Sequence, residues 1–218
     1  MIAVPAFSMQ PTKRRVFFSF HFDDIMRVNN VRQVWKIDHP DAPTMRSFYD
    51  SSLWEARQLE GDDALKRLIR EGQTNTSAVC VLIGTYTWQR RWVRYEIARA
   101  IIDGRGLLGV HLNSIKHHRP PFLPHLVGEN PFNHLSIGKV QENFLAPPKY
   151  YIFEKTTQGW IRYQDHTDSV SLPCYLADPN QNYVTPLSTA IPVYDFAHND
   201  GHKHLGAWID QAAITVGR

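Results

Sequence analysis

Long apolar runs, cysteines and an excess of one charge are all scarce in this sequence of 218 residues. No apolar run approaches the roughly 20 residues that a helix needs to cross a bilayer, so we expect no membrane-spanning segment. The 2 cysteines, Cys80 and Cys174, are too few for the disulfide framework of a small secreted protein. Residues 1–10 lack the basic start and apolar stretch of a secretory signal. Together these absences predict a cytoplasmic protein.

The charge balance is mild, with 24 Lys and Arg against 21 Asp and Glu and a net charge of +3. A surplus of this size does not indicate a nucleic-acid-binding protein, and no basic face with interleaved aromatic side chains follows Lys13–Arg15. Hydrophobic residues make up 43% of the chain, which fits a globular protein rather than a disordered one. His198, His202 and His204 are not accompanied by a cysteine pair, so we expect no metal site.

Short apolar runs alternate, in the first half of the chain, with segments that have helical periodicity. Buried strands are predicted at Val16–Phe20, Ala78–Ile83 and Gly106–Leu112, with a short additional strand at Arg46–Tyr49. Helices are predicted from about residue 25 to Trp35, over 62–72 and over 91–103. Strands that alternate with helices of this length are typical of βαβ units. We therefore predict an α/β fold, a doubly wound parallel sheet with helices on both faces.

The composition changes at about 117–190, where prolines and aromatic residues accumulate. Further elements are predicted in this half of the chain: strands at Lys149–Glu154, Trp160–Gln164 and Ile191–Phe196, and a helix at Gly201–Val216. The first two of these strands flank a hairpin turn at 157–159. We expect a loosely docked arm at 1–13 and a single domain at 14–218. That domain carries a β-rich insertion, at about 117–190, before its last strand and helix.

Two loops stand where a doubly wound sheet binds ligands, outside the carboxyl ends of its strands. One follows the strand that ends at Phe20, and the other leads into the helix at 91–103. The predicted buried stripe of that helix is Val93, Ile97, Ala100 and Ile101. Glu96 falls at the edge of the stripe, and Trp92, one turn earlier, points into the same space. A carboxylate beside an indole suits a ribose and a heterocyclic ring. The alternative is a solvated Glu96 that pairs weakly with Arg99, beside a Trp92 that merely packs.

The sequence RVFFSFH at 15–21, followed by Asp24, resembles the first box of TIR domains, in which a strand ends in Ser and an aromatic residue. The resemblance is to the bacterial TIR-like proteins typified by the Thoeris anti-phage sensor. The other segments that carry it are RVNNVR at 27–32, FYD at 48–50, VLIGT at 81–85, RWVRYEI at 91–97, VYDF at 193–196 and WIDQAA at 208–213. The resemblance covers residues 14–113 well and 191–217 more loosely, and it does not extend to 117–190.

This resemblance implies a flavodoxin-like TIR fold and an enzyme of the NAD glycohydrolase or ADP-ribosyl cyclase type. Such enzymes cleave the bond between nicotinamide and ribose, and NAD is their substrate, so no cofactor is implied. The family's catalytic glutamate lies in a W-x-x-x-E arrangement, which corresponds here to Trp92 and Glu96. The product would be an ADP-ribose-derived signal nucleotide that reaches a downstream effector in anti-phage defence. A phage-derived trigger and self-association into a homo-oligomer are also implied.

In this family the first box lines the nucleotide pocket. The resemblance therefore makes four residues candidate contacts of NAD: Ser19, Phe20, His21 and Asp24. Arg27 is a candidate for contacting a phosphate, and Trp92 for stacking on a ring. The alternatives are that Asp24 only caps the following helix and that Arg27 is an ordinary helix-surface residue. Residues 50–61 correspond to the family's mobile loop, which gates the site and mediates assembly.

Two other functions stay open at this point. A TIR-like adaptor would act through protein contacts alone, and it would have no need to keep Glu96 together with Trp92. A nucleotide glycosyl-transferase would use Glu96 on the same sheet but on a different substrate. Release of nicotinamide from NAD distinguishes an NAD-cleaving enzyme from both alternatives.

Overall fold

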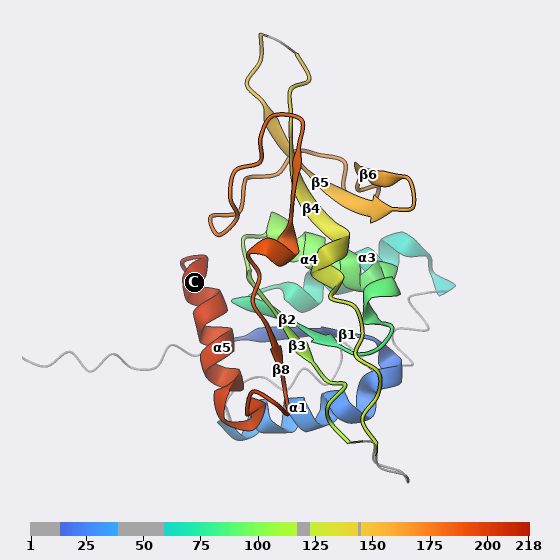
Figure 1. The fold of residues 1–218 in the computed structure, drawn as a ribbon, viewed down its shortest axis with the longest axis vertical. Coiled ribbons are helices and arrows are strands. Elements are labelled where there is room, and N and C mark those ends of the chain that lie inside the picture. The colour runs from blue at the N-terminus through green and yellow to red at the C-terminus, as the bar shows by residue number, and fades with distance from the viewer. Residues whose placement is uncertain (1–13, 39–58, 117–122, 144) are drawn as a thin grey trace, which may run out of the picture.

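A four-stranded parallel sheet, sheet A, forms the centre of the part of the chain that the structure describes, in the strand order β1-β2-β3-β8 (Figure 1). The computed structural model describes residues 14–38, 59–116, 123–143 and 145–218. The strands of sheet A are β1 (Val16–Phe20), β2 (Ala78–Ile83), β3 (Gly106–His111) and β8 (Val193–Asp195). All of their pairings are parallel, which confirms the predicted α/β architecture. The additional strand predicted at 46–49 lies outside the described residues.

Helices cover both faces of sheet A, as a doubly wound fold requires. The helices are α1 (Ile25–Asp38), α3 (Asp62–Gln73), α4 (Arg91–Ile102) and α5 (Gly201–Thr215). In Figure 1, α1 and α5 lie on one side of the sheet, with α3 and α4 on the other. The side chains of β1 alternate between these two sides. Phe17 joins the cluster that contains α4, whereas Phe18 and Phe20 join the cluster that contains α1 and α5.

The insertion before β8 forms a second, antiparallel sheet, sheet B, in the order β6-β5-β4-β7. Its strands are β4 (Leu135–Val140), β5 (Lys149–Thr156), β6 (Gly159–Arg162) and β7 (Val184–Pro186). The pairing of β5 with β6 confirms the predicted hairpin. Strands β4 and β7 were not predicted.

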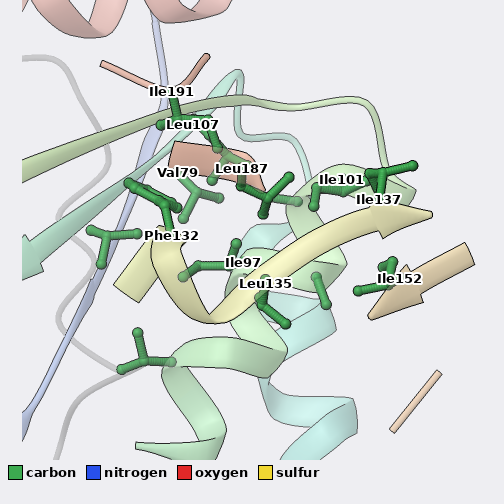
Figure 2. Close-up of a cluster of buried hydrophobic side chains, with 14 of the residues drawn as sticks. Val79, Ile97, Ile101, Leu107, Phe132, Leu135, Ile137, Ile152, Leu187 and Ile191 are labelled. Atoms are coloured by element: carbon green, nitrogen blue, oxygen red, sulfur yellow. The ribbon is translucent and has the colours of Figure 1, made fainter. Parts of the chain in front are cut away.

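Sheet B and sheet A share one hydrophobic core through α4. Ile137 of β4 and Ile152 of β5 are fully buried in the same cluster as Ile97 and Ile101 of α4 and Val79 of β2 (Figure 2). Burying an aliphatic side chain of this size stabilises the folded state by about 2 kcal/mol relative to exposure. The insertion is therefore packed against the helix that carries Glu96.

Glycines lie at or next to the ends of α3 and α4. Gly104 adopts a positive φ of 61°, and Arg105 N donates to Ala100 O at 2.9 Å, so this glycine ends α4, whose last residue is one before the predicted end at 103. Helix α3 differs from its predicted bounds by one residue at its carboxyl end. Gly61 is its N-cap residue, and the helix continues past Gly72 to Gln73. Within the described residues, no helix is long and apolar enough to cross a membrane.

Candidate active site

Glu96 is brought to the end of β1 by the packing of α4 on sheet A. Ser19 points to the same face of the sheet as Phe17, because side chains two residues apart on a strand share a face. The Oγ atom of Ser19 donates a hydrogen bond of 2.5 Å to Oε2 of Glu96. Ser19 is 0% exposed and Glu96 is 2% exposed. Because both partners are buried, water does not compete for this bond.

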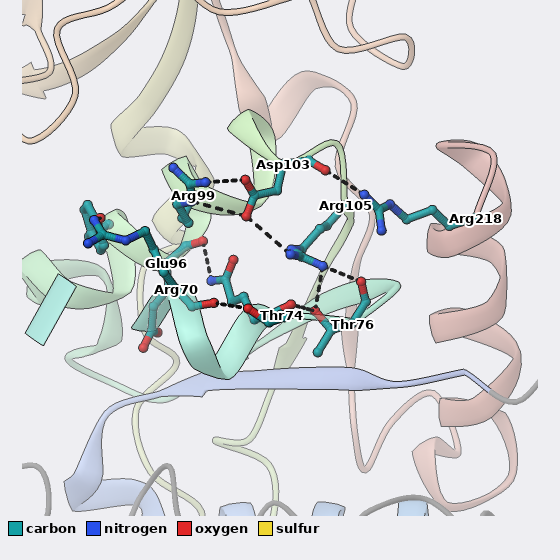
Figure 3. Close-up of polar contacts among 10 residues, drawn as sticks. Arg70, Thr74, Thr76, Glu96, Arg99, Asp103, Arg105 and Arg218 are labelled. Carbon is teal, nitrogen blue, oxygen red and sulfur yellow. Dashed lines mark hydrogen bonds and ion pairs between the residues drawn. The ribbon is translucent and has the colours of Figure 1, made fainter. Parts of the chain in front are cut away.

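The alternative in which a solvated Glu96 pairs with Arg99 is wrong. Arg99 instead makes a two-pronged ion pair with Asp103, at 2.5 and 3.2 Å (Figure 3). Burial of a carboxylate is costly unless hydrogen bonds compensate it, and the hydroxyl of Ser19 supplies such a bond to Glu96.

The backbone of Glu96 also accepts a hydrogen bond, from a side chain of α3. Gln73, the last residue of α3, is 0% exposed, and its Nε2 donates to the Glu96 carbonyl oxygen at 2.9 Å. This bond ties α3 to the middle of α4. As a result, the position of the carboxylate relative to β1 depends on two helices rather than one.

Trp92 lies one turn before Glu96 and is half-buried. Its indole packs edge-on against the ring of Tyr95, with centroids 6.1 Å apart and an interplanar angle of 83°. The Arg91 guanidinium lies over the indole, 4.8 Å from its centroid. The predicted buried stripe of α4 is confirmed: Val93, Ile97, Ala100 and Ile101 are all buried. A stacking role for Trp92 remains a prediction.

His21, the residue after β1, lies beside the start of α4. Burial lowers the pKa of His21 below its ordinary value, and the positive charge of nearby Arg90 lowers it further. Asp23, whose carboxylate lies 3.5 Å from Nδ1, acts in the opposite direction. The imidazole is therefore uncharged at neutral pH, so it can accept a hydrogen bond or stack but brings no fixed positive charge.

Asp24 reaches across to the end of β2. It is 6% exposed, and burial raises the pKa of its carboxyl group above the ordinary value, although Arg27 opposes that shift. The carboxyl group rests against Gly84, where any side chain would overlap it. Asp24 ends a short 3-10 turn at Phe22–Asp24, and no side-chain capping bond is formed at the start of that turn.

Comparison with known proteins agrees with this architecture. The family model described as "Thoeris protein ThsB, TIR-like domain" matches residues 17–117. A protein of Bacillus cereus (strain MSX-D12), named "Putative cyclic ADP-D-ribose synthase ThsB1", is 35% identical in an alignment that covers 90% of this chain and 99% of that protein. The chain belongs to the ThsB TIR-like family. Since about a tenth of the chain lies outside the alignment, most of the insertion is shared with this ThsB relative.

Two of the predicted NAD contacts, Phe20 of the first box and Arg27 of α1, are not brought to Glu96. Phe20 is 6% exposed and packs with α1 and α5, on the face of sheet A opposite to Ser19. Arg27 is not a surface residue: it is 5% exposed, and its Nε donates to the Ile115 carbonyl oxygen at 3.0 Å. In this ThsB-family chain, Arg27 therefore ties α1 to the segment after β3. A strict alternation count along β1 could have placed Phe20 correctly.

A segment that was not predicted from the sequence lies over the carboxyl ends of β2 and β3. Asn113 is 2% exposed, and its Nδ2 donates to Thr85 Oγ1 at 3.1 Å and to the Leu126 carbonyl oxygen at 2.5 Å. Its Oδ1 accepts from Gly128 N at 3.4 Å. We call residues 123–130 the strap. Gly128 packs so closely on Gly84 that a side chain there would meet the Gly84 carbonyl oxygen.

Across the described residues, no group of three or more His, Cys, Asp or Glu side chains is arranged to hold a metal ion. The site residues that carry chemistry are instead a buried carboxylate, a serine hydroxyl, an uncharged imidazole and an indole. Residues of these types can bind an organic substrate through hydrogen bonds and stacking.

Proposed function

We propose that this TIR-like protein cleaves the bond between nicotinamide and ribose in NAD and converts the remaining ADP-ribosyl group into a signal nucleotide for anti-phage defence. The observation that carries the proposal is the buried Glu96 carboxylate, held at the carboxyl end of β1 by the Ser19 hydroxyl. Membership of the ThsB TIR-like family and the cyclase name of its B. cereus relative support the same reaction. NAD is then a substrate, and no cofactor is required.

Glu96 acts by charge in this proposal. As the bond from ribose C1′ to the nicotinamide nitrogen breaks, the ribose gains oxocarbenium character, and a fixed carboxylate stabilises the developing positive charge. Ser19 holds the carboxylate in place, so little reorganisation is needed when the charge appears. A group held in advance in a water-poor setting is worth far more than the same group in water.

The leaving group needs no acid. The nicotinamide nitrogen is already cationic in NAD, so the electron pair of the breaking bond leaves it neutral. An uncharged His21 is compatible with that chemistry, since no proton has to be delivered. C1′ is then attacked by an acceptor. A hydroxyl or ring nitrogen of the same molecule gives a cyclic product, whereas water gives ADP-ribose.

Around the reacting bond we assign Trp92 to stacking on a ring of NAD, and His21 and Asp24 to the mouth of the site. Phe20 and Arg27 support the site from the opposite face of the sheet and from α1. Downstream, the signal would activate an effector protein, and a phage-derived component would trigger the enzyme in the cytoplasm, with self-association of the chain. An adaptor that acts by protein contacts alone has no use for a buried carboxylate held by Ser19.

The test is to incubate the purified protein with NAD, alone and with lysate of phage-infected cells, and to measure released nicotinamide. Mass spectrometry of the second product separates the outcomes, because a cyclic product is lighter than ADP-ribose by one water. Nicotinamide release under either condition supports the proposal. Absence of release under both conditions would overturn it.

A further inference from the structure

The insertion contacts Arg91, the first residue of α4, through the carboxylate of Asp165, which follows β6. Asp165 Oδ2 accepts from Arg91 Nε at 2.9 Å, and Oδ1 accepts from Arg91 Nη2 at 2.7 Å. Lys66 of α3 adds a third contact at 2.8 Å. The Asp165 side chain is only 9% exposed. Surface ion pairs are usually worth little, but a two-pronged pair with an arginine inside a network is the geometry that does contribute.

Each of the three nitrogens of the Arg91 guanidinium contacts a carboxylate oxygen. Its remaining nitrogen, Nη1, lies 2.6 Å from Asp62 Oδ2 at the start of α3. Guanidinium donors lie in the plane of the group, so two carboxylates that bind its edges determine how that plane is oriented. The face of the plane then remains for stacking, and it lies over the Trp92 indole at 4.8 Å.

The orientation of Trp92 is therefore linked to a residue of the insertion. Edge contact with Tyr95 restrains the indole on one side, and the Arg91 guanidinium restrains it on another. Without Asp165, Arg91 would keep Asp62 alone, and an arginine held by a single exposed partner rotates readily. The indole would then lose the flat, fixed surface that stacks on it.

We propose that Asp165 of the insertion is a positioning residue for NAD binding, because it clamps Arg91 and so holds the Trp92 indole in the orientation that meets the substrate. This rests on the proposed function for its substrate, although the clamp itself does not. This gives the insertion a role in the site, because the segment after β6 contributes the carboxylate that holds Arg91 at the start of α4. Asp165 touches neither substrate nor reacting atoms, so it acts on binding rather than on bond cleavage.

The kinetic test compares Asp165→Asn with Asp178→Asn, an aspartate of the insertion that pairs with Lys139 and does not contact α4. We expect Asp165→Asn to raise KM for NAD about fivefold with kcat nearly unchanged, the size of one lost cation–π restraint. Asp178→Asn should match the wild type. Arg91→Lys should behave like Asp165→Asn, since an ammonium group cannot replace a two-pronged planar contact. An unchanged KM in Asp165→Asn would overturn the proposal.

A double substitution separates positioning from a general structural effect. If Asp165 acts through Trp92, Asp165→Asn should raise KM no further once Trp92→Ala is present. A merely structural aspartate would add its effect in both backgrounds, and that result would overturn the proposal.

A measurement without substrate separates this inference from the proposed function. The fluorescence of Trp92 is obtained as the difference between the protein and its Trp92→Phe variant, each with and without Asp165→Asn. We expect acrylamide to quench Trp92 more strongly in the Asp165→Asn protein and not in the Asp178→Asn protein. Equal quenching would overturn the clamp, whether or not the protein cleaves NAD. Failure to release nicotinamide despite increased quenching would overturn the proposed function alone.

Discussion

Ser19 Oγ donates a 2.5 Å hydrogen bond to Glu96 Oε2, which joins the fourth residue of β1 to the middle of α4. Ser19→Ala removes this donor and leaves a buried carboxylate with one bond fewer. We expect the free energy of unfolding to fall by about 2 kcal/mol and kcat for nicotinamide release to fall about tenfold. Chemical denaturation and steady-state kinetics measure the two effects.

Ser136→Ala is the matched control for Ser19→Ala. Ser136 is also 0% exposed, but its Oγ has no hydrogen-bond partner among the described residues. Its removal should leave stability and activity close to those of the wild type, since no bond is lost. Equal effects of the two substitutions would show that the hydrogen bond from Ser19 to Glu96 contributes neither to stability nor to kcat.

Asp24 should make stability depend on pH in an unusual direction. Its pKa is raised above the ordinary 3.8 by burial, so the folded protein keeps the proton at pH values where the unfolded chain has lost it. This contribution is fully present below the unfolded pKa and is lost as pH rises through the folded pKa. The free energy of unfolding of the wild type minus that of Asp24→Asn should therefore decrease as pH rises above about 4. A difference that stays flat or increases contradicts the assignment.

Asp165 should show the opposite dependence. The hydrogen bonds from Arg91 are the main reason that its pKa falls from 3.8 to about 2, and Lys66 adds to the effect. The contribution is present above the unfolded pKa and is lost as pH falls through the folded pKa. Relative to Asp165→Asn, the wild type should lose stability between about pH 4 and pH 2, by on the order of 1 kcal/mol after solvent screening. Urea titrations at several pH values measure it, and a pH-independent difference would argue against the ion pair in solution.

The strap should be held mainly by Asn113. Asn113→Asp replaces the donor that serves Thr85 and the Leu126 carbonyl with an acceptor, so two carbonyl-like oxygens would face each other. We expect a loss of about 2 kcal/mol and faster hydrogen exchange of amides in residues 123–130. Thr85→Val, which removes only one bond to the strap, should have a smaller effect on the same amides. Equal exchange in Asn113→Asp and the wild type would show that Asn113 does not hold the strap.

The fold was largely predictable because its strands and helices carry strong local signals. Ala78–Ile83 is apolar throughout and proves to be buried at every position. In α4, helical spacing placed Glu96 at the edge of the buried stripe, and Gly104 marked the end of the helix. Strand β4 was missed because Gly138 breaks its pattern; that glycine makes room for the ring of Phe153. Strand β7 is three residues long and too short to show a period.

The contacts that define the site could not be predicted, because they join residues far apart in the chain. Ser19 and Glu96 are 77 residues apart, and Arg91 and Asp165 are 74 apart. Spacing along one helix indicates which side chains share a face, but not what lies opposite that face. Helical spacing brought Glu96 and Trp92 together and the family resemblance supplied their roles, but the resemblance gave no guidance for residues 117–190, where Asp165 lies.

The central claim is that the Glu96 carboxylate stabilises the charge that forms when nicotinamide leaves, and Glu96→Gln tests it most directly. The amide keeps the shape and an oxygen that accepts from Ser19, but it removes the negative charge. The matched control is Glu71→Gln, an exposed glutamate of α3. With thermal stability near that of the wild type, we predict that Glu96→Gln lowers the rate of nicotinamide release roughly a hundredfold or more, while Glu71→Gln leaves it unchanged. A folded Glu96→Gln protein that releases nicotinamide at the wild-type rate would contradict the account.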